Sequence, residues 1–232
     1  MTTRRWLLGA LLLMGCPGVV GSGTAATETR TIGAFRTLRA ENGFRVTVTK
    51  GERALSVTTD DNVISLVETV VEGDVLVLRL KPGVSLSTTR GLVAALTSDV
   101  LEGVEVSGGG RVAGPVSAAA TFPVVATGGS QVELSGVMSS LVTLDASGGG
   151  TVTLAGSTTE ARLTAGGGAT VTTRDLSATK VTVDLSGGSQ ARVSSSNEVS
   201  GNASGGSTLV VSGNPATVSV TTSGGSTVTR SN

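Results

Sequence analysis

The sequence predicts an all-β chain folded as a parallel β-solenoid, and three observations predict this class. A small residue followed by two glycines and by Gly, Ser or Ala recurs with spacings of 20, 20, 19, 20, 18 and 19 residues. Aromatic residues make up only 2% of the chain, and β-branched residues, which suit strands better than helices, fill the repeats. Polar and apolar residues alternate beside each phrase. Such repeats bury their apolar face by stacking. The phrases begin at Ser107, Thr127, Ser147, Gly166, Ser186, Ser204 and Ser223.

The amino-acid composition excludes several classes of function. The 17 basic and 17 acidic side chains leave no net charge, so no overall field attracts the chain to nucleic acid or acidic lipid. The chain has no histidine, the side chain most used for proton transfer near neutral pH and the commonest metal ligand. Its single cysteine permits no internal disulfide and no cysteine-based zinc site. We therefore expect no cofactor, no metal and no nucleic-acid partner.

Residues 1–26 have the features of an export segment. Arg4 and Arg5 supply a positive start, and residues 7–14 form an apolar stretch too short to span a membrane permanently. Residues 3–8 also resemble a twin-arginine signal. The sequence therefore predicts that the chain is exported.

Two positions for the signal cut are compatible with the sequence. Leu13-Met14-Gly15-Cys16 resembles the bacterial lipobox, in which the chain is cut before the cysteine and a lipid is attached to it, although methionine is larger than the residue usual there. The alternative is an ordinary secretory signal cut near Thr24-Ala25-Ala26, which would discard Cys16. We favour lipidation of Cys16, because chance rarely places a lone cysteine at this point. Residues 27–31 are expected as a flexible tether, extending over 17–31 if Cys16 carries the lipid.

The N-terminal β-rich part of the solenoid is expected over residues 32–103. Phe44, Val46 and Val48 alternate with polar residues, as in a half-buried strand. After Asn62 the apolar spacing becomes helical, but the residues are mostly valines, so we expect one short helical turn and then a strand. Residues 72–74 indicate a turn that leads into an apolar strand over 75–80.

Residues 104–232 form the Gly-Gly repeat region, in which three columns of residues align. Because glycine adopts backbone angles that other residues resist, each Gly-Gly pair is expected at a corner between two short strands. Two apolar columns should point inward and one polar column outward. The inward columns are Val112, Val132, Val152, Val171, Ala191, Leu209 and Val228, and Val104, Val124, Leu144, Leu163, Val183, Gly201 and Val220. The outward column is Arg111, Gln131, Thr151, Thr170, Gln190, Thr208 and Thr227.

The chain over about residues 32–232 resembles a family of bacterial envelope proteins described as "putative auto-transporter adhesin, head GIN domain". The resemblance implies a right-handed parallel β-helix, export, often as a lipoprotein, and an adhesive role. It implies no catalytic or ligand-binding residues. The matching segments are Phe44-Arg45-Val46-Thr47-Val48, Asp61-Asn62-Val63, Glu72-Gly73-Asp74-Val75-Leu76-Val77-Leu78 and Leu101-Glu102-Gly103-Val104-Glu105-Val106-Ser107-Gly108.

Two strings that look catalytic are better explained by the repeats. Residues 108–113 match the G-x-G-x-x-A dinucleotide fingerprint, but Gly114-Pro115 follows where that motif needs a helix, and the phrase recurs six times. Ser177-Ala178-Thr179-Lys180 matches S-x-x-K, but its companion motifs are missing and the string lies between expected strands.

The sequence also gives little support for calcium binding or for cleavage of sugar chains. Asp145 and Asp184 share an outward column with Glu105, but two coils separate the aspartates by about 10 Å, too far for one calcium ion. A polysaccharide-cleaving β-helix would need paired carboxylates and aromatic platforms. The nearest pair is Asp60-Asp61, which is more simply a turn and a helix cap.

We therefore expect a non-catalytic, exported cell-envelope solenoid that is anchored by a lipid on Cys16. It would present a Thr/Ser-rich face as an adhesin-like binding module for a glycan, a cell surface or an envelope protein, at the outer surface or in the periplasm, or secreted if Cys16 is removed. The alternative is a structural or sensory envelope lipoprotein with a protein or cell-wall partner, and a polysaccharide-cleaving enzyme is least favoured. Because open strand edges pair with other chains, we also expect self-association through the C-terminal coil.

Overall fold

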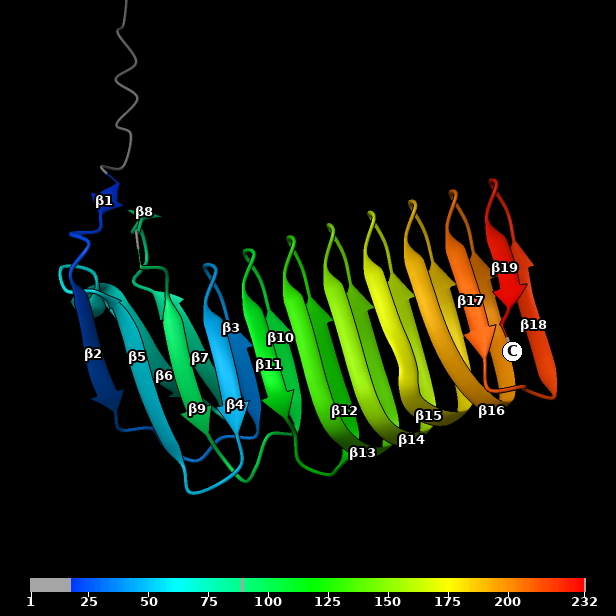
Figure 1. The fold of residues 1–232 in the computed structure, drawn as a ribbon, viewed down its shortest axis with the longest axis horizontal. Coiled ribbons are helices and arrows are strands. Elements are labelled where there is room, and N and C mark those ends of the chain that lie inside the picture. Colours follow the sequence, from blue (N-terminus) through cyan, green and yellow to red (C-terminus); the bar gives the residue numbers. More distant parts are fainter. Residues whose placement is uncertain (1–17, 89, 232) are drawn as a thin grey trace, which may run out of the picture.

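The computed structural model describes residues 18–88 and 90–231, which form one long stack of β-coils (Figure 1). Seventeen strands join a single continuous sheet, and β1 pairs separately with β8. Within these residues the one helical element is the short 3-10 helix η1, Ile64–Leu66. The all-β class is therefore confirmed. The strands are β1 Val19–Val20, β2 Ala25–Arg30, β3 Thr37–Ala40, β4 Arg45–Thr49, β5 Ala54–Asp60, β6 Val67–Glu72, β7 Val75–Leu80, β8 Leu86–Ser87, β9 Val93–Thr97, β10 Gly103–Val106, β11 Arg111–Pro115, β12 Ala119–Ala126, β13 Gln131–Ala146, β14 Thr151–Ala165, β15 Thr170–Leu185, β16 Gln190–Ala203, β17 Thr208–Ser212, β18 Thr217–Thr222 and β19 Thr227–Arg230.

Each coil of the repeat region has two walls that meet at a Gly-Gly corner. The post-glycine wall contains the strands that follow the corners, namely β11, the first parts of β13 to β16, β17 and β19. The pre-glycine wall contains the strands that precede them, namely β10, β12, the last parts of β13 to β16, and β18. All these pairings are parallel, so the predicted parallel solenoid is confirmed.

The predicted inward columns form the core between the two walls. Val112, Val132 and Val152 pair in register and are fully buried. Val104, Val124 and Leu144 do the same on the other wall. The predicted outward column from Arg111 to Thr227 is also in register and is exposed or half-exposed. In the last described coil, Val218, Val220 and Val228 are only partly buried.

The Gly-Gly corners are type I′ turns. The first glycine of each pair has φ between 58° and 67° and the second between 75° and 82°. Two successive positive φ values define this turn and strongly favour Gly or Asn. Asn42 and Gly43 have φ values of 54° and 80°, and a Cβ on Gly108 would lie 3.1 Å from the Asn42 nitrogen. An eighth corner therefore continues the ladder, and the Gly-Gly pattern alone did not reveal it.

The N-terminal part does not stack in chain order. The coil made by β3 and β4 lies between β10 and β11 on one side and β7 and β9 on the other. Three pairings here are antiparallel: β2 with β5, β5 with β9, and β6 with β7. The predicted helical turn after Asn62 is confirmed as η1, followed by β6. The predicted turn at residues 72–74 joins β6 to β7.

One expectation about the start of the fold is wrong. Residues 25–30, expected to lie largely in a flexible tether, form β2, which pairs with β5 over six residue pairs. The fold therefore begins well before Ile32. Residues 1–17 of the expected export segment, including Cys16, lie outside the described residues, whereas its residues 18–26 contain β1 and the start of β2.

Candidate functional site

The outer face of the post-glycine wall carries ladders of hydroxyl groups. In β14 and β15, Thr151 is in register with Thr170, and Thr153 with Thr172, and all four are half-exposed. We call these residues the threonine block. On one side the neighbouring coil presents Gln131 and Glu133, and on the other side Gln190 and Arg192. The block is thus an open array of hydrogen-bonding groups on stiff parallel strands.

The outer face of the pre-glycine wall, and of β3 which pairs with β10, carries paired charges. Arg39 Nε lies 2.6 Å from Glu105 Oε2, and this hydrogen bond raises the pKa of the Arg39 guanidinium. Lys180 pairs with Glu198 across adjacent coils at 3.4 Å, and Arg162 with Glu160 at 2.9 Å. Exposed pairs of this kind add little stability. They do keep the wall from presenting a patch of one charge sign.

The aspartates weighed for calcium binding are placed as the sequence predicted. Asp145 and Asp184 lie in the column that begins at Glu105, and Thr164 separates them on the intervening coil. Among residues 18–88 and 90–231, no three His, Cys, Asp or Glu side chains are grouped as metal ligands would be. The arrangement offers no shared coordination site between these two carboxylates.

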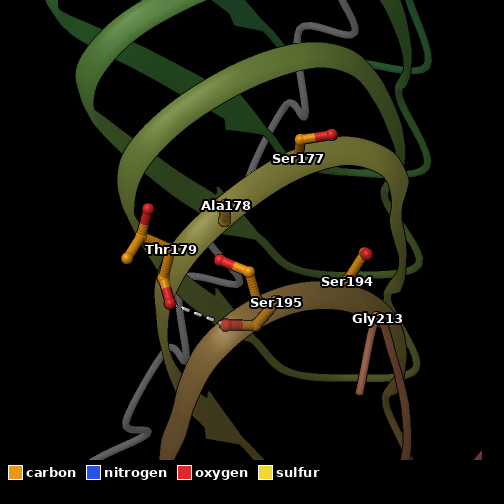
Figure 2. A pocket seen from close by; sticks show the side chains of 7 residues that line it. Ser177, Ala178, Thr179, Ser194, Ser195 and Gly213 are labelled. Carbon is orange, nitrogen blue, oxygen red and sulfur yellow. Dashed lines mark hydrogen bonds between the residues drawn. The ribbon is translucent and has the colours of Figure 1, made fainter. Parts of the chain in front are cut away.

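The shortest repeat leaves a small hollow at the corner opposite the Gly-Gly ladder (Figure 2). The pairing of β15 with β16 shifts between Thr173 and Lys180, because the coil that starts at Ser186 is only 18 residues long. The hollow has a volume of about 180 Å³ and is lined by Ser177, Ala178, Thr179, Ser194, Ser195, Ser196 and Gly213. Ser195 is buried, and its hydroxyl donates a hydrogen bond to the Thr179 carbonyl oxygen at 2.9 Å. The repeat spacing of 18 residues was the sequence signal for this irregularity.

The two catalytic-looking strings have structural roles in the solenoid. Residues 108–113 span a corner and the start of β11, so a strand stands where a dinucleotide site requires a helix. Ser177 lies at the rim of the hollow, whereas Lys180 forms its ion pair with Glu198. Neither string therefore has the surroundings that its motif needs.

A larger recess lies between the Asn42-Gly43 corner and the loop that carries β8. Its volume is about 430 Å³. Leu80, Val84, Leu86 and Leu92 give it an apolar side, while Asn42, Ser85 and Thr88 add polar groups. The recess lies where the long connection from β7 through β8 toward β9 takes the place of a Gly-Gly corner.

Asp60 is buried and is used to hold the chain together. Its Oδ1 accepts a hydrogen bond from the Gly23 N–H at 2.6 Å, and its Oδ2 accepts one from the Thr88 hydroxyl. Asp61 is exposed and accepts a hydrogen bond from the Ser22 hydroxyl at 2.5 Å. The two carboxylates thus bind protein groups from the N-terminal segment, which is a structural role. The expected helix cap is wrong, because Asp60 ends β5 and the N-cap of η1 is Val63, without a side-chain hydrogen bond.

Replacing these aspartates should separate a buried role from an exposed one. We expect Asp60→Ala to lower the free energy of unfolding by about 2–3 kcal/mol, because the half-buried donors around this buried carboxylate lose a charged acceptor. Asp61→Ala should cost less than about 1 kcal/mol, because water replaces its contacts. Urea unfolding followed by circular dichroism measures both values. Equal losses for the two variants would contradict the structural role of Asp60.

No helix in the part of the chain that the structure describes is long and apolar enough to cross a membrane.

A family model described as "Putative auto-transporter adhesin, head GIN domain" matches residues 34–215. The chain belongs to this family. The resemblance seen in the sequence is therefore confirmed, and the head GIN domain occupies both the irregular N-terminal coils and most of the Gly-Gly repeats.

Solved structures share this fold. A putative adhesin from Bacteroides fragilis is similar with a TM-score of 0.83 and 18% identity, over 92% of this chain and 100% of that one. A putative adhesin from Parabacteroides distasonis has a TM-score of 0.71 and 16% identity, over 92% of this chain and 100% of that one. A putative lipid binding protein from the same species has a TM-score of 0.69 and 16% identity, over 92% of this chain and 99% of that one. At these identities the similarity shows the fold. No curated protein matches the chain.

Proposed function

We propose that this head GIN domain protein is a non-catalytic, exported binding module of the cell envelope, anchored by a lipid on Cys16. It would bind a repeating polar partner, a glycan or an envelope protein, through the outer face of its post-glycine wall. The observation that carries the proposal is the threonine block, which repeats the same two hydroxyl groups on two adjacent coils. A ladder of weak contacts binds a repeating polymer by multivalency. The family and the similar structures are described as adhesins or as a lipid-binding protein, and these descriptions support a binding role.

The second candidate is a structural or sensory envelope lipoprotein with a protein or cell-wall partner, and the lack of exposed aromatic residues in the repeat region supports it. Sugar rings usually stack on aromatic side chains. Phe122, the aromatic residue of the repeat region, is fully buried. A partner that offers hydrogen-bonding groups in a line, such as a peptide or a strand edge, would be matched as well as a glycan. The envelope location is common to both candidates.

The location is tested by protease treatment of intact cells that produce either the wild-type protein or Cys16→Ser. With a lipid anchor at the outer surface, the wild-type protein should be digested from whole cells, and the variant should appear in the medium or periplasm. Complete protection until the envelope is broken would contradict an outward-facing adhesin. It would leave the periplasmic alternative, which crosslinking would then examine.

The threonine block is tested with isosteric replacements. We expect Thr151→Val together with Thr170→Val to weaken partner binding about tenfold, because each lost hydrogen bond contributes roughly 0.5–1.5 kcal/mol. The matched control is Thr164→Val together with Thr182→Val, which removes two hydroxyls from the pre-glycine wall. Binding of envelope glycans and wall fragments by the full chain is the measurement. An equal loss in both double variants would contradict a role specific to the block.

A further inference from the structure

We propose that residues 18–30 remain in the mature protein and hold the N-terminal end of the solenoid together. The export signal would then be cut on the N-terminal side of Gly18. The lipid anchor would then be joined to the solenoid with no flexible tether. We call residues 18–30 the N-terminal clasp. This inference rests on the proposed function only in taking the chain to be exported. It selects between the two cut positions that the sequence leaves open.

The first part of the clasp is β2, which completes the end of the sheet (Figure 1). It pairs antiparallel with β5, from Ala25 opposite Asp60 to Arg30 opposite Leu55. The hydroxyls of Thr27 and Thr58 lie 2.8 Å apart across this pair, and Ala26 packs against the core. A cut at Ala26 would remove the start of this strand.

The second part is β1, which holds the long loop that carries β8. Val19 pairs with Leu86, and both side chains pack against the hydrophobic core. The Val19 N–H donates to Ser85 O and the Gly21 N–H to Ser87 O, both at 2.8 Å. A cut near residue 25 would remove β1 entirely and leave Leu86 without its cover.

The third part is the segment that wraps around Asp60. Gly23 donates its N–H to this buried carboxylate, and the Asp61 N–H donates to Thr24 O at 2.9 Å. A Cβ on Gly21 would overlap the Asp60 carboxylate, so a larger residue there would force either the segment or the carboxylate to shift. Removing a donor from a buried carboxylate is costly. The buried carboxylate therefore indicates that residues 21–24 stay with the folded protein.

The position of the clasp sets the distance between anchor and solenoid. A cut before Cys16 keeps the whole clasp and leaves Pro17 as the single residue between Cys16 and Gly18. Two residues span at most about 7 Å. The β1 end of the solenoid would thus be held directly at the membrane surface, and the walls could not move away on a long linker.

The cut position is tested by intact mass and N-terminal sequencing of the mature wild-type protein recovered from cells. We expect a chain that starts at Cys16 and carries the mass of the lipid. A chain that starts at or before Gly18 without lipid would support the clasp and overturn the anchor. A start at residues 25–27 would overturn both.

The clasp itself is tested by amide hydrogen exchange of the mature protein. We expect the bonded amides of residues 25–30 to exchange as slowly as their partners in β5. Gly21→Ala should speed exchange over residues 19–24 and 86–88 by about tenfold or more, because either the segment or the Asp60 carboxylate must shift. Gly18→Ala is the matched control, since its Cβ would lie 3.7 Å from Ser85 O, an ordinary contact. Exchange over residues 18–30 at the rate of an unstructured peptide would overturn the clasp, even if Cys16 carries a lipid.

Discussion

Gly201→Val should destabilise the protein by about 3 kcal/mol, although the repeat pattern suggests the opposite. Gly201 occupies an inward column whose other members are valine or leucine, so a valine would restore the consensus. The backbone at Gly201 has φ of 129°, a region that β-branched residues rarely adopt. A Cβ there would also overlap the carbonyl oxygen of Val183 on the preceding coil.

Urea unfolding of the full chain, followed by circular dichroism, measures the effect of this replacement. Ser200→Val is the matched control, because the neighbouring side chain lies half-exposed on the outer face and a valine suits a strand. We expect the control to stay within about 0.5 kcal/mol of the wild type. A Gly201→Val protein as stable as the wild type would show that the coil can shift to admit the side chain.

The two glycines of one corner should respond unequally to alanine. Both Gly187 and Gly188 have positive φ, so each replacement should cost about 1 kcal/mol from the backbone conformation alone. A Cβ on Gly187 would also lie 3.0 Å from the Gly167 nitrogen of the preceding coil, whereas a Cβ on Gly188 meets nothing within 4 Å. We expect Gly187→Ala to cost about 2–3 kcal/mol in total.

The comparison of these two variants isolates the stacking of the corners from their turn geometry. Gly168 and Gly188 donate their N–H groups to the carbonyls of Gly187 and Gly205 at 3.0 and 2.9 Å, so the corners also carry hydrogen bonds between coils. Urea unfolding of both variants under the same conditions gives the difference. Equal losses would mean that the turn conformation, and not the approach of neighbouring corners, decides which residue is tolerated.

The repeat region was predicted well because its information is local. Each Gly-Gly pair sets a corner by its backbone angles, and the alternation on either side decides which residues face inward. Val132 and Val152 therefore lie where the period places them, in register and buried. The Asn42-Gly43 corner was missed because no second copy of Asn-Gly recurs at the repeat period, although the dipeptide itself favours a type I′ turn.

The candidate site was predicted only in outline. The sequence indicated outward Thr and Gln columns, and the structure places Thr151 beside Thr170 and Thr153 beside Thr172. The small hollow lined by Ser195 could be predicted only as an irregularity in the repeat spacing. Its lining depends on where the two missing residues are absorbed between β15 and β16, which neighbouring coils decide through their pairing.

The sequence by itself determined the all-β class, the repeat period, the corners and the inward and outward columns of residues 104–232. These follow from local backbone preferences and alternation that recur at a fixed period. Only the tertiary structure decided the N-terminal end. There β3 and β4 insert between strands that follow them in the chain, and β2 pairs antiparallel with β5. No repeat in the sequence predicts these pairings. They depend on contacts between segments far apart in the sequence, such as the packing of Val19 and Ala26 on the core and the hydrogen bond from Gly23 to Asp60.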